Sequence, residues 1–366
     1  MALIDELGFK PKPDFAGRMK KVLLRQGEPD RVPFYELFMD KPVKDAILGK
    51  PTLIPSLLPF GEPRKLIPNE IEFWQRMGYD YVPAAPAYGF GMKVALTKDT
   101  AEGSNGPRFW MNESGADLIK TRVDFEKYFW PDPDTVSLDL FDAFADHLPA
   151  GMVVFGQTAG VFENVIWMLG HEGLSYMMAD DPGLVQMIFD RVGSSLVRLI
   201  ERMVERDFVG AIQMGDDLGF KTHTTISPAA LRSYVFPWQK KAVEASHKRG
   251  KPFILHSCGN LEKVMDDLIG IGIDAKHSFE DEITPVTEAK KLWGDRVAIL
   301  GGLDMDFLCR STPEQVREKT RSLLRECAPG GGYALGTGNT VANYIPVKNY
   351  LAMIKAGWEF GKAPRA

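Results

Sequence analysis

Cysteines, long apolar runs and clustered basic residues are all scarce in this sequence. The chain of 366 residues has only three cysteines, and they stand too far apart to form a disulfide framework (Cys258, Cys309 and Cys327). No apolar run approaches the roughly 18 residues that a membrane-spanning helix needs, so we expect no membrane association. The net charge is −5 and no basic block is present, which argues against a nucleic-acid partner.

The beginning of the sequence and its few cysteines indicate the compartment. Residues 1–9 carry early acidic side chains and no signal-peptide pattern. Unpaired thiols are typical of a reducing compartment. Hydrophobic residues make up 45% and charged residues 25%, which is the balance of an ordinary soluble globular protein. We therefore expect a cytoplasmic enzyme.

Short apolar segments alternate with amphipathic segments about eight times, which predicts alternating strands and helices. The expected strands cover residues 31–38, 79–85, 151–157, 209–217, 253–255, 273–277, 297–301 and 332–337. Near-continuous apolar runs such as Met152–Phe155 suit strands that are covered on both faces. Eight successive units of this kind predict an α/β fold of the (β/α)8 TIM-barrel type, formed by one domain over residues 1–366.

Residues 86–150 break the alternation. They contain two short apolar segments, separated by a stretch rich in glycine and proline, which predicts a small antiparallel β insertion after the second strand. An insertion at this end of a barrel serves as a lid or contacts a partner, and an arm without a function is an equally good interpretation.

The segment Lys251–Asn260 is the most informative part of the sequence. Its apolar residues predict a buried strand that runs into His256 and Cys258 before a glycine turn. Side chains two positions apart on a strand point to the same side, so the imidazole and the thiol project together. Such a pair suits a thiophilic ion such as zinc, although a core histidine beside a buried thiol has the same pattern.

Polar side chains collect at the predicted carboxyl ends of the strands, where the active site of a TIM barrel lies. These candidates are Glu36, Gln157, Asp216, Asp217, His223, His256, Cys258, His277, Glu280, Asp304, Thr337 and Asn339. Each acid taken alone also fits a loop cap or a surface ion pair. Together they predict a polar, acid-rich pocket for a metal, for proton transfer, or for a cationic or hydroxylated substrate.

The adjacent acids Asp216 and Asp217 cannot both face this pocket, because neighbouring residues on a strand point to opposite sides. We favour Asp217 for the pocket. The other acid is then expected to contact backbone or to cap a neighbouring loop.

Several phrases resemble the uroporphyrinogen decarboxylase superfamily, and more fully its cobalamin-dependent methyltransferase branch. The phrases are Asp30–Phe34, Gly215–Gly219 with Ser227–Ala229, His256–Asn260, Gly301–Asp304, and Thr312–Arg317 followed by Pro329–Tyr333. The resemblance extends over nearly the whole chain and implies a single (β/α)8 barrel. It is much less specific about the reaction.

Two segments differ from the patterns typical of the superfamily, and these differences bear on the expected substrate and on the expected zinc ligands. True uroporphyrinogen decarboxylases have an arginine-rich segment after the first strand, whereas Phe34–Asp40 contains two acids and no arginine. An acid-rich mouth would repel a substrate that bears many carboxylates. The zinc methyltransferases add a cysteine after strand eight to a His-x-Cys pair. Here His256 and Cys258 match the pair, but Asn339 stands in the place of the third ligand.

The resemblance implies a corrinoid-linked methyltransferase that moves a methyl group between a small methylated substrate (an ether, amine or thiol) and a corrinoid protein. The chain lacks the Asp-x-His-x-x-Gly signature for cobalamin, so the corrinoid is expected on a partner. The expected catalytic residues are Asp217, His256, Glu280 and Glu36. The substrate is expected to contact Gln157, His223, Asn339 and Asp216. Zinc is expected to bind His256, Cys258 and Glu280.

Other interpretations stay open at this point. The third zinc ligand could be Glu280, His277, Asp217 or Glu36, or the metal has been lost and a general acid replaces it. A cofactor-free decarboxylase or lyase on a small acid would use His256 and Asp217. A hydrolase with a carboxylate pair and a binding protein without catalysis are further alternatives.

Overall fold

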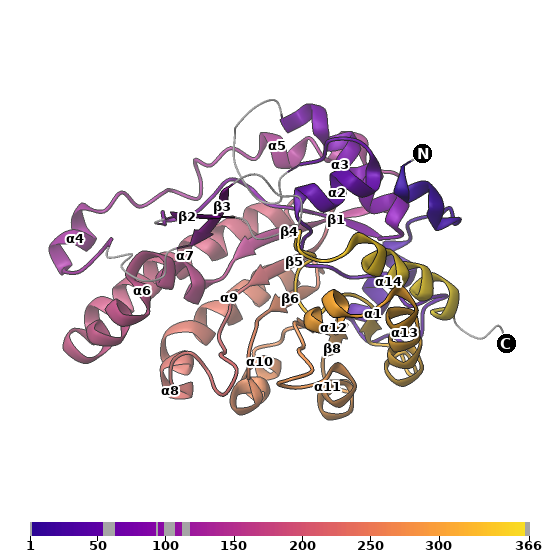
Figure 1. The fold of residues 1–366 in the computed structure, drawn as a ribbon. Helices are drawn as coiled ribbons and strands as arrows, with labels where there is room; N and C mark the ends of the chain where they lie inside the picture. The colour runs from indigo at the N-terminus through magenta and orange to yellow at the C-terminus, as the bar shows by residue number, and fades with distance from the viewer. Residues whose placement is uncertain (1, 54–62, 93, 99–106, 112–117, 363–366) are drawn as a thin grey trace.

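The computed structural model describes residues 2–53, 63–92, 94–98, 107–111 and 118–362 (Figure 1). Its main sheet has seven parallel strands, and each strand pairs with the next one of the sheet along the chain. The strands are β1 (Tyr81–Ala84), β4 (Val153–Ala159), β5 (Val209–Gly215), β6 (Phe253–His256), β7 (Ala275–His277), β8 (Ala298–Leu300) and β9 (Tyr333–Ala334). Parallel pairing in chain order requires every connection to cross outside the sheet.

Helices occupy these connections and surround the strands (Figure 1). The longer α-helices are α2 (Lys41–Leu48), α3 (Ile67–Met77), α6 (Val161–Asp180), α7 (Pro182–Val204), α9 (Phe236–His247), α11 (Val286–Trp293), α13 (Pro313–Cys327) and α14 (Val347–Phe360). The shorter ones are α1 (Lys20–Leu23), α4 (Arg122–Lys127), α5 (Asp139–Asp142), α8 (Pro228–Ala230), α10 (Met265–Gly270) and α12 (Met305–Arg310). Within the part of the chain that is described, no helix combines the length and apolarity needed to span a membrane.

Short 3-10 and π turns complete the helical part. They are η1 (Leu3–Leu7), η2 (Phe15–Met19), η3 (Pro63–Leu66), η4 (Ala145–His147), η5 (Leu231–Val235) and η6 (Glu262–Val264). Helix α13 illustrates how local sequence sets a boundary. Thr312 and Gln315 form a reciprocal capping box around its first turn, and a proline occupies the first helical position. The helix therefore begins where the sequence predicts.

The predicted first strand, residues 31–38, differs from the expectation. Phe34 forms only an isolated parallel bridge with Leu335, beyond the end of β9. On the other side, the Tyr81 hydroxyl of β1 accepts a hydrogen bond from Glu36 N (2.8 Å) and donates one to Glu36 O (2.6 Å). A proline in this segment has no N–H for a regular ladder. Among the described residues, the structure is thus an α/β fold with a barrel-like sheet of seven regular strands, and not the eight expected.

A separate antiparallel pair follows β1 in the chain. Strand β2 (Val94–Lys98) pairs with β3 (Pro107–Met111), with Leu96 opposite Phe109. Residues 93, 99–106 and 112–117 of the predicted 86–150 insertion lie outside the described residues. The expected lid role of this region stays a prediction.

The register of the main sheet arranges polar side chains in layers inside it. Gln157 of β4 pairs with Gln213 of β5, and His256 of β6 pairs with His277 of β7. Paired residues on neighbouring strands point to the same face, so both pairs face the same side. All four side chains are buried. The histidine layer lies nearer the carboxyl ends of the strands, where the candidate site is found.

Candidate functional site

Strands β5 and β6 bring together a carboxylate, an imidazole and a thiol. Asp217 follows β5, His256 ends β6, and Cys258 comes two residues later. The ligand atoms of these three residues all lie within 4.8 Å of one another. His256 Nε2 is 3.5 Å from Cys258 Sγ and 3.6 Å from Asp217 Oδ1. His256 projects from the end of β6, and the segments that follow β6 and β5 add the thiol and the carboxylate.

The loops after β5 and β6 fix this arrangement. Asp217 Oδ1 accepts a hydrogen bond from Cys258 N at 2.8 Å, which orients the carboxylate toward the thiol. Gly259 has a φ of +83°, and a Cβ on it would lie 2.2 Å from the backbone carbon of Gly219. Only glycine permits this close crossing of the two loops. Gly259 is therefore needed where the loop that carries Cys258 crosses the loop after β5.

Asp216 has a different environment from its neighbour. It is fully buried, and its two oxygens accept hydrogen bonds from Glu163 N (2.9 Å) and from Gln239 Nε2 (2.8 Å). The first of these bonds caps the N-terminus of α6. Burial raises the pKa of Asp216 to about 6. We therefore correct the expectation that Asp216 binds substrate, because both of its oxygens are used to hold the fold.

His256, a member of the group of three, contacts a second buried histidine, His277. His256 Nδ1 lies 2.8 Å from His277 Nδ1, and His277 Nε2 lies 3.0 Å from Thr337 O. Burial lowers the pKa of His256 to about 3 and the pKa of His277 well below its ordinary value. Both rings are thus neutral near pH 7, and His256 is available as a ligand rather than as a cation.

The sulfur of Cys258 has two polar neighbours of its own. Asn339 Nδ2 donates a hydrogen bond to Cys258 Sγ at 3.2 Å, and Ser278 Oγ lies 3.9 Å from the same atom. Burial raises the pKa of Cys258 well above its ordinary value. Asn339 thus supports the thiol by hydrogen bonding, and its amide N–H is not a metal ligand.

Glu36 lies deeper than the sequence suggested. Its side chain is fully buried and accepts hydrogen bonds from Thr337 N (2.9 Å) and Thr337 Oγ1 (2.5 Å). Burial raises its pKa to about 8. Glu36 is not part of the group of three, and its hydrogen bonds hold Thr337, whose carbonyl contacts His277. Its expected catalytic role stays a prediction.

The raised pKa of Glu36 predicts a pH-dependent stability. A carboxyl group that binds its proton more tightly in the folded state stabilises the fold at low pH, and this contribution is lost as the pH rises from about 4.5 toward 8. The unfolding free energy of the wild type minus that of Glu36→Gln should fall by more than about 1 kcal/mol between pH 5 and pH 8. Urea unfolding at several pH values measures this difference. A constant difference would contradict the prediction.

Three other expected site residues lie apart from the group of three. Glu280 accepts a hydrogen bond from Gly259 N and lines an adjacent pocket, so it is not among the converging ligands. Gln157 Nε2 donates to the carbonyl of Leu37 at 2.6 Å inside the sheet. His223 is exposed on the loop after β5, outside the group of three, and its expected contact with substrate stays a prediction.

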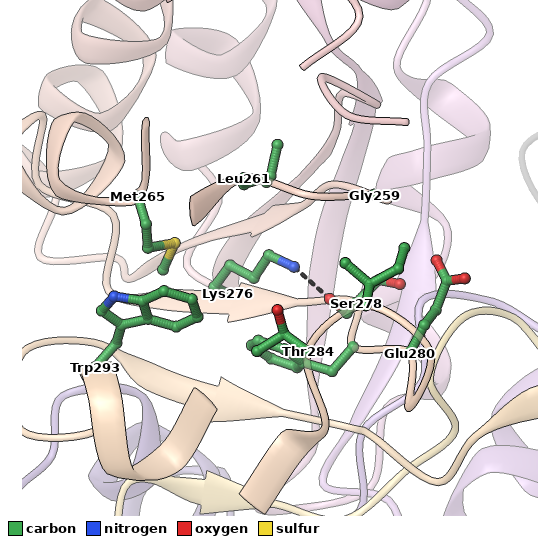
Figure 2. Close-up of a pocket in the computed structure, with 10 residues that line it drawn as sticks. Gly259, Leu261, Met265, Lys276, Ser278, Glu280, Thr284 and Trp293 are labelled. Atoms are coloured by element: carbon green, nitrogen blue, oxygen red, sulfur yellow. Dashed lines mark hydrogen bonds between the residues drawn. The ribbon is translucent and has the colours of Figure 1, made fainter. Parts of the chain in front are cut away.

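Lys276 and Ser278 were missed by the sequence interpretation. Figure 2 shows Lys276 reaching toward the backbone oxygen of Ser278, to which its Nζ donates a hydrogen bond. The Nζ also lies 4.2 Å from the centre of the Phe279 ring. Burial lowers the pKa of Lys276 to about 8, while Cys258, Asp217 and Glu280 act in the opposite direction. The signal in the sequence was a lysine within a predicted strand, directly before His277.

The donor set fits a zinc ion. Thiolate, imidazole nitrogen and carboxylate oxygen are all ordinary zinc ligands, and three protein ligands leave a position for a substrate. The Asp217 side chain is 42% exposed, whereas that of His256 is 6% exposed, so the group is buried on one side and open on the other. Asp217, His256 and Cys258 would hold the ion.

Comparisons with known proteins agree with this fold. Residues 84–360 match the family model of uroporphyrinogen decarboxylase (URO-D). The chain is similar to a uroporphyrinogen decarboxylase of Hydrogenovibrio crunogenus, with 25% identity over 184 residues that cover 49% of each chain. It is also similar to the methylcobamide:CoM methyltransferase MtaA of Methanosarcina barkeri, with 25% identity over 135 residues, 37% of this chain and 38% of that one.

The chain thus spans half or less of the length of these curated relatives in each match. The fold is similar to that of a methyltransferase from Methanosarcina mazei, with a TM-score of 0.69 and 16% identity, over 95% of this chain and 99% of the other. At that identity the likeness concerns the fold alone. Because the family model covers well over half of the sequence, this chain belongs to the uroporphyrinogen decarboxylase (URO-D) family.

Proposed function

We propose that this protein is a methyltransferase that moves a methyl group between a small methylated ether, amine or thiol and a corrinoid on a separate protein. The observation that carries the proposal is the convergence of Asp217, His256 and Cys258 at the carboxyl end of the sheet. The similarity to a methylcobamide:CoM methyltransferase supports it. The carboxyl groups of Asp217 and Glu280 at this end of the sheet argue against a substrate with many carboxylates.

The metal in this proposal is zinc with a mixed nitrogen, sulfur and oxygen ligand set. When bound, zinc would polarise the heteroatom that carries or receives the methyl group. Asp217 supplies the oxygen ligand that replaces the missing second thiolate, because Asn339 stands where the related zinc enzymes have a cysteine. Cys258 must lose its proton for metal binding, so the affinity for zinc should rise with pH.

The side chains around the site have distinct tasks in this proposal. Asn339 donates an N–H to the sulfur of Cys258, which spreads its negative charge. Lys276 adds a buried positive charge near the two anionic ligands. When the methyl group departs, the bonding electron pair stays on the heteroatom. That atom then takes a proton from the solvent at the exposed side of Asp217.

Two measurements test the proposed function: the zinc content of the purified protein and its rate of methyl transfer to cobalamin. Protein purified without chelator should contain about one zinc ion per chain. The zinc-loaded protein should convert free Co(I) cobalamin to methylcobalamin, followed by absorbance, with at least one donor from a panel of methyl ethers, methylamines and methyl thioethers. Metal-free protein that instead releases CO2 from a small acid would favour the lyase alternative.

The two adjacent acids provide a matched pair of variants. Asp217→Asn removes an anionic ligand and should weaken zinc binding by more than about 100-fold without unfolding the protein. Asp216→Asn should keep zinc but destabilise the fold by about 1–3 kcal/mol, since a buried hydrogen bond to Glu163 or Gln239 is lost. Chelator competition and urea unfolding measure the two effects. Equal zinc affinity in both variants would exclude Asp217 as a ligand.

A further inference from the structure

We propose that His277 is a positioning residue that holds His256 in the tautomer whose Nε2 carries no proton. This nitrogen then faces Asp217 and Cys258 with a free lone pair. The inference rests on the metal site proposed above and deepens it. His277 is not one of the three proposed ligands, and the choice of Asp217, His256 and Cys258 as ligands does not depend on it.

Two hydrogen bonds determine which ring nitrogen of His277, and then which ring nitrogen of His256, carries the proton. A carbonyl oxygen can only accept, so the contact between His277 Nε2 and Thr337 O (3.0 Å) places a proton on that nitrogen. A neutral imidazole carries one N–H, which leaves His277 Nδ1 as an acceptor. The 2.8 Å contact between the two Nδ1 atoms needs one proton, and His256 must supply it. His256 Nε2 is then unprotonated.

The reverse arrangement would require a positively charged His277. That ring is fully buried, lies edge-on to the Tyr35 ring with centroids 4.9 Å apart, and forms no ion pair with any carboxylate in the described part of the chain. Its nearest charged neighbour in the strand is the cation Lys276. An unpaired charge at such a place is strongly disfavoured.

The same contacts show that His277 orients its partner and does not relay protons. The chain of hydrogen bonds ends at the carbonyl of Thr337, which cannot accept a proton and pass one on. Glu36 holds the backbone and the hydroxyl of Thr337, so the position of that carbonyl is itself fixed. Outer groups of this kind commonly set the tautomer and orientation of a histidine ligand.

Three variants of the full-length protein test the proposal. His277→Phe keeps the ring shape but removes the acceptor, and it should weaken binding of zinc by about 10- to 100-fold in chelator competition. His277→Asn can present its side-chain oxygen to His256 Nδ1–H and should keep the affinity within a few-fold. His223→Ala, at the exposed histidine after β5, is the control and should leave the affinity unchanged.

Substitution of Co(II) for zinc gives a second readout of the ligand geometry. The visible absorption of the Co(II) form should change in His277→Phe and not in His277→Asn. A folded His277→Phe protein with wild-type affinity and an unchanged Co(II) spectrum would overturn the proposal. A merely structural role would instead lower stability in both variants without separating them in metal affinity.

The protons are also observable without any variant. In ¹⁵N-histidine-labelled, metal-free wild type, the imidazole resonances should report protonated Nδ1 for His256 and protonated Nε2 for His277. A doubly protonated His277 would overturn the inference even if His277→Phe fails to fold. Absence of zinc binding in the wild type would instead refute the proposed function, since the tautomer measurement does not depend on metal.

Discussion

Replacing Cys258 with alanine should remove bound zinc and lower the rate of methyl transfer by about 10³-fold or more. The thiol supplies the only sulfur within the group of three. Its sulfur accepts a hydrogen bond from Asn339 Nδ2, and the backbone N–H of Cys258 donates to Asp217. Alanine leaves the strand and its backbone hydrogen bonds in place. Metal analysis and the Co(I) cobalamin assay measure the two losses on the same preparation.

Cys309→Ala is the matched control. Cys309 is a free, partly buried thiol on α12, outside the converging ligands, so its removal should change neither metal content nor rate. If Cys258→Ala retains zinc and methyl-transfer activity, this thiol is not a zinc ligand, and the proposed ligand set of Asp217, His256 and Cys258 is wrong.

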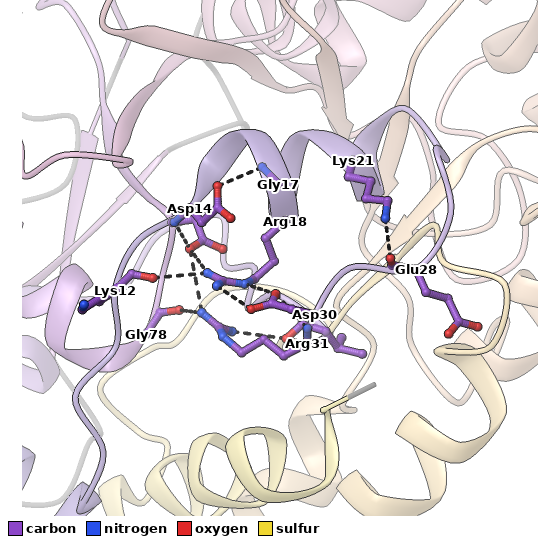
Figure 3. Close-up of polar contacts among 11 residues, drawn as sticks. Lys12, Asp14, Gly17, Arg18, Lys21, Glu28, Asp30, Arg31 and Gly78 are labelled. Carbon is purple, nitrogen blue, oxygen red and sulfur yellow. Dashed lines mark hydrogen bonds and ion pairs between the residues drawn. The ribbon is translucent and has the colours of Figure 1, made fainter. Parts of the chain in front are cut away.

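Asp80→Ala should lower the free energy of unfolding by about 3–5 kcal/mol, because two buried guanidinium groups lose a buried carboxylate and only Arg18 keeps another, in Asp30. Asp80 precedes β1, at the end of the sheet opposite the candidate site, and is fully buried. Its Oδ1 lies 2.5 Å from Arg18 Nη1 and 3.8 Å from Arg31 Nη2. Figure 3 shows these arginines with Asp30 and Asp14 around them. Urea unfolding at constant pH measures the change.

Asp30→Ala is the control for this cluster. Asp30 also pairs with Arg18, at 2.7 Å, but its side chain is 66% exposed, and water can replace it. Its removal should cost about 1 kcal/mol or less. Similar costs for the two variants would mean that burial does not decide the strength of these ion pairs. Neither variant should change metal content, since the cluster lies at the far end of the strands.

Local patterns made several elements predictable from the sequence. Helix α13 follows from a capping box and a proline at its start, and β6 follows from a short apolar run before a glycine turn. Helix α6 was not predicted. Most of its first half is buried, so apolar residues stand on every side and leave no amphipathic period to detect.

Only those parts of the candidate site that depend on residues close together in the sequence were predictable. The spacing of His256 and Cys258 in the predicted strand indicated that they point together, and they do converge although β6 ends at His256. Because neighbouring side chains on a strand alternate, the sequence also predicted that Asp216 and Asp217 point to opposite sides. It did not decide which of them caps a helix. That decision depends on the N-terminus of α6, which meets one acid and not the other.

The sequence by itself determined the alternating elements, the family and the histidine–cysteine pair, because each depends on residues close together in the chain. Tertiary structure alone decided that Asn339 donates to Cys258, 81 residues away, and that His277 contacts His256. It also turned the expected first strand into an extended segment held through Tyr81. Contacts of this kind arise from the packing of distant strands, and no spacing within a single strand encodes them.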